Sequence, residues 1–428
     1  MTVTLSMSKM VDNMENNNNS HSLYDDQKER FLLDRIEKLC GKESFRPKLD
    51  HMKTLLSEDI RAIEKRSQVV VVAGTNGKGG TCHHLKNILS HQNVSYGLWT
   101  SPHVLTLCER FNLSGAPISY EQLIELIEEN SVVARESELS FYEFLFFIFT
   151  KWVSKNIPDV LILEVGLGGR FDAVNIFTEP LTAIVSISRD HTEILGKDLK
   201  SILFEKYGVV RKGGTLISGI EQNFLKETLS HWIARDEVNF VKVQRHEYSY
   251  EITNQRIALE LFSRLNIERD SFDLAQDYTH KIMPNESRGR REKMTINARE
   301  LIFIGAHNFD GHRKMLAELY GLENSSHVFI LGFSTGREDQ LENIIDLYSK
   351  YPCLVDEIIL SDYSHPRAIA KEVLLSFKDR EEVLIADDIN LNWEFILTDE
   401  SYKNKKIIIS GSYFFIGEWQ KYILDHHS

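Results

Sequence analysis

The sequence predicts an α/β protein in which a P-loop-type parallel sheet is followed by a smaller Rossmann-like α/β domain. Four consecutive valines at residues 69–72 are typical of a strand buried on both faces of a parallel sheet. A glycine-rich turn that contains Lys78 follows them directly. Strand-like and helix-like segments then alternate along the chain, which indicates parallel β/α units with ligand sites at the carboxyl ends of the strands.

Length and composition allow two domains and exclude several classes of function. The chain has 428 residues, of which 42% are hydrophobic and 26% are charged, enough for two separate cores. No apolar run approaches the roughly 20 residues of a membrane-spanning helix, and we see no apolar core of a signal peptide. A formal charge of −13 opposes a broad nucleic-acid-binding face. We therefore expect a cytoplasmic protein without membrane or nucleic-acid partners.

The distribution of the cysteines also indicates a cytoplasmic protein. The four are scattered without metal-ligand spacing, at Cys40, Cys82, Cys108 and Cys353. Reduced thiols in a reducing compartment are therefore expected rather than disulfides or a zinc site.

The composition and periodicity of the first part of the chain predict a tail and then a first α/β domain over residues 25–285. Residues 1–24 are too poor in apolar side chains to order themselves, so we expect a disordered tail. Apolar side chains at helical spacing predict helices within residues 24–66, 83–89, 121–129, 141–153 and 198–208. Short apolar runs predict the strands, at residues 69–73, 96–100, 159–166, 181–188 and 214–219.

The pattern of the remaining sequence predicts a second α/β domain over residues 286–428. A polar stretch between residues 270 and 291, with Pro284 and a basic run, indicates an interdomain hinge. Beyond it the expected strands are residues 301–304, 327–333, 357–361, 383–386 and 406–410. The expected helices are residues 312–320 and 367–377.

The turn after the first strand has the properties of a phosphate cradle. Its glycines let backbone N–H groups approach an anion, and the following helix directs its positive end at the same place, with Lys78 on the phosphates. The spacing differs from a generic P-loop, because Val72 and Gly79 replace the leading glycine and the Mg²⁺-binding hydroxyl. A plain glycine-rich turn is the alternative. The candidate phosphate-binding residues, which the resemblance described next assigns to ATP, are Gly74, Thr75, Asn76, Gly77, Lys78, Gly79, Gly80 and Thr81.

The sequence of this loop, AGTNGKGGT, closely resembles the ATP-binding loop of the folylpolyglutamate synthase and dihydrofolate synthase family, a branch of the Mur ligase superfamily. Further family motifs are matched in order, at residues 100–103 (TSPH), 109–111 (ERF), 115–118, 140–144, 163–175, 190–196 and 205–208. Each motif is weak alone, but their order is specific. The resemblance implies Mur ligase architecture and an ATP-dependent ligase. It would join dihydropteroate or folate to L-glutamate through an acyl phosphate.

The resemblance also implies a Mg²⁺ site. Ser101, Glu164 and His191 occupy positions that bind Mg²⁺ in the family, although a lone histidine is often structural. Lys206 corresponds to a lysine that family members carbamylate, and a carbamate, unlike an ammonium, can bind a metal. Otherwise Lys206 is a surface or phosphate-pairing lysine, and Tyr207 beside it stands where the family usually has alanine.

Other roles are implied residue by residue. Arg290 would reach an ATP phosphate and Asn254 would lie on the adenine side. His307 and Ser412 would help place the amino acid and the acyl intermediate, and would form the catalytic set with Lys78 and Lys206. Four residues are candidates for the pterin-bearing substrate, with core packing as the alternative for the two aromatic ones: Phe141, Tyr142, Arg170 and Asp172.

Several positions depart from the family pattern. Gly80 replaces a serine, so Thr75 or Thr81 would have to supply a hydroxyl. Ile304 replaces the aspartate expected to hold the ribose, and Phe309 replaces a proline. Weak ribose selectivity is expected unless Asn308 or Asp310 has taken over.

These changes leave two other readings open. One is a diverged paralogue with a different acid and amine, and the other is a nucleotide-binding protein without ligase activity. For the main reading we expect ATP and Mg²⁺ as cofactors, small-molecule substrates and a monomer.

Overall fold

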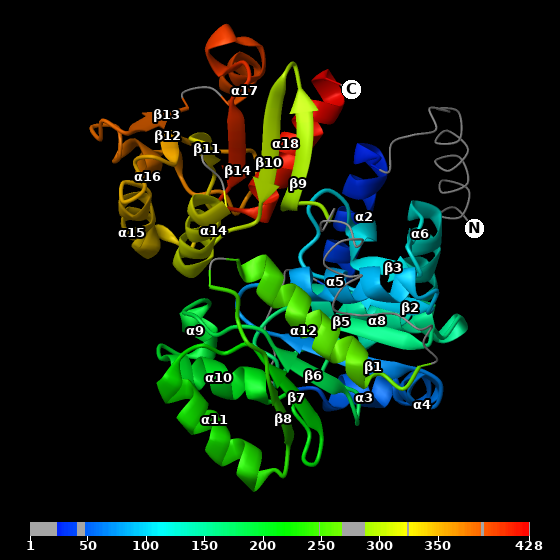
Figure 1. Ribbon diagram of the computed structural model, residues 1–428. Coiled ribbons are helices and arrows are strands. Elements are labelled where there is room, and N and C mark those ends of the chain that lie inside the picture. The colour runs from blue at the N-terminus through cyan, green and yellow to red at the C-terminus, as the bar shows by residue number, and fades with distance from the viewer. Residues whose placement is uncertain are drawn as a thin grey trace, which may run out of the picture.

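The computed structural model describes residues 24–40, 48–247, 249–267, 287–322, 325–386 and 389–427. The tail expected at residues 1–24, apart from Tyr24, and most of the hinge expected at 270–291 lie outside these residues. Figure 1 shows two α/β bodies, one coloured blue to green and the other yellow to red, each built around its own sheet. The two-sheet α/β class predicted from the sequence is confirmed.

The first sheet has eight strands, with β1 at its centre. In spatial order they are β4 (Ala116–Pro117), β3 (Phe111–Leu113), β2 (Tyr96–Trp99), β5 (Val160–Glu164), β1 (Gln68–Ala73), β6 (Leu181–Ile184), β7 (Thr215–Ser218) and β8 (Asn239–Lys242). β1 pairs in parallel with β5 and with β6. Only β3 and β4 run antiparallel to their neighbours. The carboxyl ends of β1, β5 and β6 therefore meet at one edge of the sheet.

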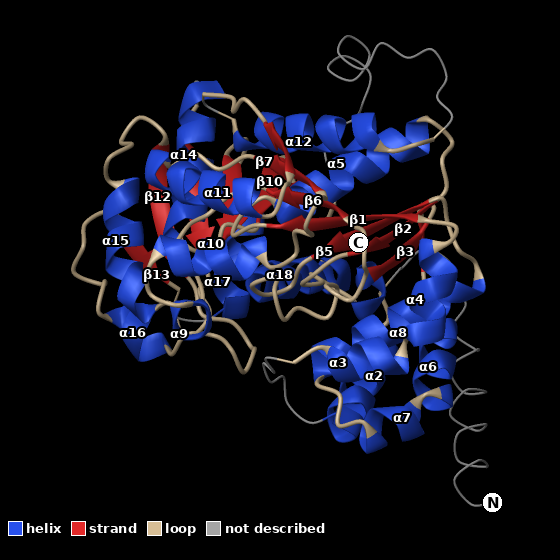
Figure 2. Ribbon diagram, turned by 90° about the horizontal axis from the view of Figure 1, so that it is seen from below, coloured by secondary structure: helices blue, strands red, loops and turns tan. Residues whose placement is uncertain are grey.

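Helices cover both faces of this sheet, which explains the run of four valines. Val70 and Val72 pack with residues of α5 (Lys78–His91) and α12 (Tyr250–Arg264), whereas Val69 and Val71 pack into the core on the opposite face. Figure 2 shows α5 and α12 on one side of the strands, with α2 and α8 on the other. The remaining helices before the second sheet are α2 (Asp26–Cys40), α3 (Asp50–Leu55), α4 (Ser57–Glu64), α6 (Tyr120–Glu129), α7 (Ser131–Glu136), α8 (Phe141–Lys155), α9 (Thr192–Leu195), α10 (Leu199–Tyr207) and α11 (Asn223–Arg235), with a 3-10 helix at Leu107–Arg110.

The second sheet has six strands. In spatial order they are β13 (Val383–Ile385), β12 (Val355–Leu360), β11 (His327–Leu331), β14 (Lys406–Ser410), β10 (Arg299–Ile304) and β9 (Arg290–Ile296). All pairings are parallel except that of β9 with β10. Its helices are α14 (Phe309–Leu322), α15 (Glu338–Tyr348), α16 (Lys371–Leu375), α17 (Ile389–Thr398) and α18 (Tyr413–His426), with a 3-10 helix at Glu400–Tyr402. Apolar clusters lie on both faces.

The structure adds elements that the sequence did not predict. β8 is largely exposed. β9 begins with four charged residues, of which Arg290 and Arg291 fall at the end of the segment expected to be a hinge. Neither strand therefore forms an apolar run. The β3–β4 hairpin and the helices α11, α12, α15, α17 and α18 were also not predicted. Among the described helices, none combines the length and the apolar character needed to cross a membrane. The four cysteines are free thiols.

Candidate functional site

A cavity of about 310 Å³ lies between the two bodies, where the carboxyl ends of the central strands of both sheets meet. This is the usual ligand position in parallel α/β sheets. The predicted site residues that line it are Gly74, Thr75, Asn76, Gly77, Lys78, Gly79, Gly80, Ser101, Glu164, His191, Lys206, Asn254, Arg290, His307 and Ser412. The predicted residues outside its lining are Thr81, Phe141, Tyr142, Arg170 and Asp172.

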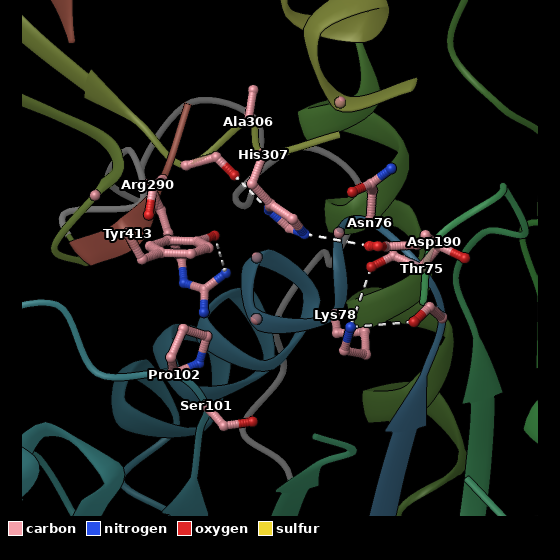
Figure 3. Close-up of a pocket in the computed structure, with 18 of the residues that line it drawn as sticks. Thr75, Asn76, Lys78, Ser101, Pro102, Asp190, Arg290, Ala306, His307 and Tyr413 are labelled. Carbon is pink, nitrogen blue, oxygen red and sulfur yellow. Dashed lines mark hydrogen bonds and ion pairs between the residues drawn. The ribbon is translucent and has the colours of Figure 1, made fainter. Parts of the chain in front are cut away.

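The loop between β1 and α5 is shaped to hold an anion. Gly77 caps α5 with a φ of +89°, a conformation that favours glycine. The loop is anchored to the next strand of the sheet, because Thr75 N donates to Ser186 O at 2.9 Å. The Lys78 ammonium donates to the carbonyls of Gly74 and Thr75, at 3.1 Å each (Figure 3). A helix amino terminus and an ammonium thus face the same cavity, which suits a phosphate.

Arg290, the first residue of β9, covers this loop. A Cβ atom at Gly79 would lie only 2.1 Å from Arg290 Cζ. Arg290 donates to the Tyr413 hydroxyl at 3.1 Å and lies 3.6 Å from Glu164 Oε2 (Figure 3). Burial alone would lower the pKa of Arg290, but Tyr413 and Glu164 hold it above its usual value. Arg290 is therefore a permanent cation placed directly against the phosphate loop.

This close approach leaves no room for a side chain at position 79 while Arg290 keeps its place. We expect Gly79→Ala to weaken ADP binding about tenfold to a hundredfold, because overpacking of about 1–3 kcal/mol must be relieved by moving Arg290 or the loop. Calorimetric titration with ADP measures this. Gly311→Ala is the matched control, since Gly311 also lines the cavity but its Cβ would come no closer than 3.3 Å to Asn308 Oδ1. Wild-type affinity in Gly79→Ala would show that Arg290 does not rest on the loop.

The four predicted metal residues converge on this cavity. Glu164 ends β5, is 2% exposed and accepts the amide of Ser101 at 3.0 Å. His191 follows β6 in a left-handed conformation with φ +49°. The Lys206 ammonium donates to the Gly74 carbonyl at 3.0 Å. Burial, and then the charge of Lys78, lower the pKa of Lys206 to about 7.

These donors fit a cation that is shared with a ligand. Within the described residues, no three His, Cys, Asp or Glu side chains are grouped closely enough to hold a metal by themselves. Mg²⁺ usually takes only one or two protein carboxylates and completes its shell with water and substrate phosphates. Glu164, beside the phosphate loop, meets that requirement.

Asp190 joins the two bodies across the cavity. Its carboxylate accepts a hydrogen bond from Asn308 Nδ2 at 2.8 Å and forms an ion pair with Arg337. Asp190 Oδ2 also lies 3.4 Å from His307 Nε2 (Figure 3). Asn76 and Asn308 exchange two further bonds of 3.1 Å. Burial would raise the pKa of Asp190, but the His307 hydrogen bond and nearby cations hold it well below its usual value. The carboxylate stays charged and ties the second body to the phosphate loop.

The sequence interpretation missed Asp190, Arg337 and Tyr413 as site residues. Asp190 was visible in the motif beside His191, but its partners come from loops more than a hundred residues away. No local pattern marks such pairing.

The four residues predicted for the pterin-bearing substrate do not line this cavity, although Asp172 and Tyr142 lie directly behind Leu167 and Gly166, which do. Asp172 is buried and accepts the amides of Leu167 and Val174, at 2.8 and 3.1 Å, and the Tyr142 hydroxyl at 3.2 Å. Burial raises the pKa of Asp172 to about 6. Phe141 packs against the core. Arg170 stacks on Phe171 and Phe204. Their substrate roles stay predictions.

The structure shows what surrounds the positions that depart from the family pattern. Thr75 Oγ1 is engaged with the backbone of Ser188, so it does not replace the hydroxyl missing at Gly80. Thr81 Oγ1 is buried outside the cavity lining, and the described residues provide no partner for it. Ile304 ends β10 and is 2% exposed.

The two residues considered as substitutes at the ribose are already engaged. Asn308 is fully buried between Asn76 and Asp190. Asp310 pairs with Lys314 at 2.9 Å and lies outside the cavity lining.

The chain is similar to known proteins whose names indicate one family. No protein-family model matches the chain. The dihydrofolate synthase/folylpolyglutamate synthase of Buchnera aphidicola subsp. Baizongia pistaciae is 26% identical over 421 residues, covering 92% of this chain and 93% of that protein. The protein of the same name from Bacillus subtilis is 25% identical over 421 residues, covering 88% and 95%.

Solved structures show the same fold. FolC from E. coli in complex with DHPP and ADP superposes with a TM-score of 0.77 at 22% identity, covering 94% of this chain and 98% of that one. A bifunctional folylpolyglutamate synthase/dihydrofolate synthase with Mn, AMPPNP and L-glutamate bound superposes with a TM-score of 0.75 at 23% identity, covering 92% and 97%. At these identities the structures establish the fold.

Proposed function

Because the chain belongs to the folylpolyglutamate synthase and dihydrofolate synthase family, we propose that it is an ATP-dependent ligase joining a pterin-bearing carboxylate to L-glutamate. Dihydropteroate, folate or both would be the acid. The observation that carries the proposal is the phosphate loop with Lys78 and Arg290 on it, in a cleft closed by the second body. Relatives with DHPP, ADP, AMPPNP and L-glutamate bound support the substrate classes.

The residues of the cleft suit acyl phosphate chemistry. The loop amides and Lys78 would bind the β- and γ-phosphates, and Arg290 would neutralise charge that develops on the γ-phosphoryl group. The acid carboxylate would attack that group in line, which gives an acyl phosphate and ADP. The amine of glutamate would then attack the acyl carbon and release phosphate.

A divalent cation has a place in this arrangement. Ser101, Glu164 and His191 would hold Mg²⁺, together with Lys206 if it is carbamylated. Bound there, the cation would neutralise the transferring phosphate. His307 and Ser412 face the same space from the second body and would place the amino acid, while Asp190 keeps that body against the loop.

Domain division, location and assembly complete the proposal. We place the domain boundary between residues 285 and 286, since the first sheet ends with β8 and the second begins with β9 at Arg290. A monomer in the cytoplasm is proposed, and the free thiols of the four cysteines fit a reducing compartment.

The proposal is tested by ADP release from ATP over a panel of acids and amines. We expect dihydropteroate plus L-glutamate to give ADP release that requires both substrates and Mg²⁺. Turnover with a different acid and amine would identify a diverged paralogue, which the changes at Ile304 and Phe309 would permit. No ADP release with any pair, despite tight nucleotide binding, would favour a nucleotide-binding protein without ligase activity.

A further inference from the structure

Carboxylates are few in the lining of the cavity. Within the part of the chain that the structure describes, they are Glu164, Asp190 and Glu251. Glu164 already faces Arg290 and the Ser101 amide, and Asp190 is held by groups of the second body. Glu251 is the carboxylate that neither the phosphate site nor the interdomain contact uses.

One oxygen of Glu251 is fixed and the other is available. Oε1 lies 2.7 Å from Nε2 of His84, a buried residue of α5. Oε2 receives one contact among the described residues, from Asn254 Nδ2 at 3.5 Å, which is at the outer limit of a hydrogen bond. The Glu251 side chain is 21% exposed and reaches the cavity. Oε2 therefore keeps most of its capacity to accept hydrogen bonds.

Gly80 of the phosphate loop faces both Asn254 and Glu251. A Cβ at Gly80 would lie 2.9 Å from Asn254 Nδ2 and 3.6 Å from Glu251 Oε2. It would therefore crowd the Asn254 amide and make ordinary contact with the Glu251 carboxylate. With glycine there, Glu251 and Asn254 lie directly beside the loop.

The charge of Glu251 limits what it can bind. Burial would raise its pKa, but the hydrogen bond from His84 and the charges of His84 and Arg291 hold it below its usual value. A carboxylate beside phosphates gains nothing from contact with them, because like charges repel. Its favourable partner on a nucleotide is a neutral hydrogen-bond donor. A nucleotide such as ATP offers ribose hydroxyls and the adenine amino group.

We propose that Glu251 recognises the nucleoside of the bound nucleotide by accepting a hydrogen bond from a ribose hydroxyl or from the adenine amino group. The inference rests on the proposed use of ATP. It also accounts for Ile304, since α12 supplies the carboxylate that the end of β10 lacks. His84 is the residue that positions Glu251.

Calorimetric titration of the full chain tests this with four nucleotides: ADP, 2′-deoxy-ADP, 3′-deoxy-ADP and purine riboside diphosphate, which lacks the amino group. We expect Glu251→Ala to raise the Kd for ADP about tenfold, as for loss of a hydrogen bond to a charged group. Of the three analogues, the one that lacks the donor contacted by Glu251 should bind the wild-type protein about tenfold more weakly than ADP does. The same analogue should bind Glu251→Ala and the wild-type protein with equal Kd. For Glu251→Gln, the Kd for ADP should lie between those of the wild type and of Glu251→Ala.

A matched control separates recognition from support of the fold. Glu260 lies on the same helix, pairs with Arg264 and does not line the cavity, so Glu260→Ala should bind ADP as wild type does. An equal loss for all four nucleotides in Glu251→Ala, or no loss for any, overturns the inference and leaves the proposed function standing. Failure of the wild type to bind any nucleotide overturns both.

Discussion

Replacing Lys78 by alanine is expected to lower kcat for ADP release by about 10²–10³-fold, the usual cost of removing one donor that stabilises developing charge. Among the described residues, the Lys78 ammonium donates hydrogen bonds to the carbonyls of Gly74 and Thr75, and Lys78 lines the cavity. We therefore expect its loss to remove a cation from the cavity without disturbing β1. Steady-state kinetics and the melting temperature measure the two effects separately.

Lys86 provides the control, because it lies two turns further along α5 and does not line the cavity. Lys86→Ala should keep near wild-type kcat. If Lys78→Ala also kept it at an unchanged melting temperature, the phosphate site would have to lie elsewhere.

The second large effect is expected at Lys206. Its ammonium is buried, and its pKa of about 7 leaves much of the amine neutral at neutral pH. Only the neutral amine adds CO₂, by forming an N–C bond and releasing a proton. We therefore expect Lys206 to carry a carbamate. Lys206→Ala should lower kcat by about 10²-fold. Acetate should restore part of the activity of this variant.

Two measurements decide the point. Mass spectrometry of the native protein in bicarbonate should show the added mass of one CO₂, which Lys206→Ala should lack. Lys200, exposed on the same helix α10, is the control, and Lys200→Ala should neither lose activity nor respond to acetate. An unmodified Lys206 with no acetate response would show that it acts as a phosphate-pairing cation.

Much of the fold, and the glycine-rich turn that lines the cavity, could be predicted from the sequence because the signals are local. A run of apolar residues marks a strand buried on both faces, as residues 69–72 do in β1. Elements with weak local signals were missed. β9 joins the second sheet by pairing its half-exposed backbone with β10, although its sequence is rich in charge.

The resemblance to a family likewise placed individual residues, and fifteen of the predicted site residues line one cavity. It did not indicate what surrounds them. Three loop glycines are contacted by side chains from outside the loop, Gly79 by Arg290 and both Gly77 and Gly80 by Asn254. Those contacts depend on where α12 and the hinge come to lie.

The sequence by itself determined the α/β class, the glycine-rich turn with Lys78 after β1, and the resemblance to the folylpolyglutamate synthase and dihydrofolate synthase family. All three depend on residues that are neighbours in the chain, whose spacing fixes strand burial, turn geometry and motif order. Only the tertiary structure decided that Asp190 holds Arg337 across the cleft, that Tyr413 supports Arg290 and that Glu251 faces the cavity. These pairs are separated by long stretches of chain, and folding of both sheets is what brings their charges within a few ångströms of each other.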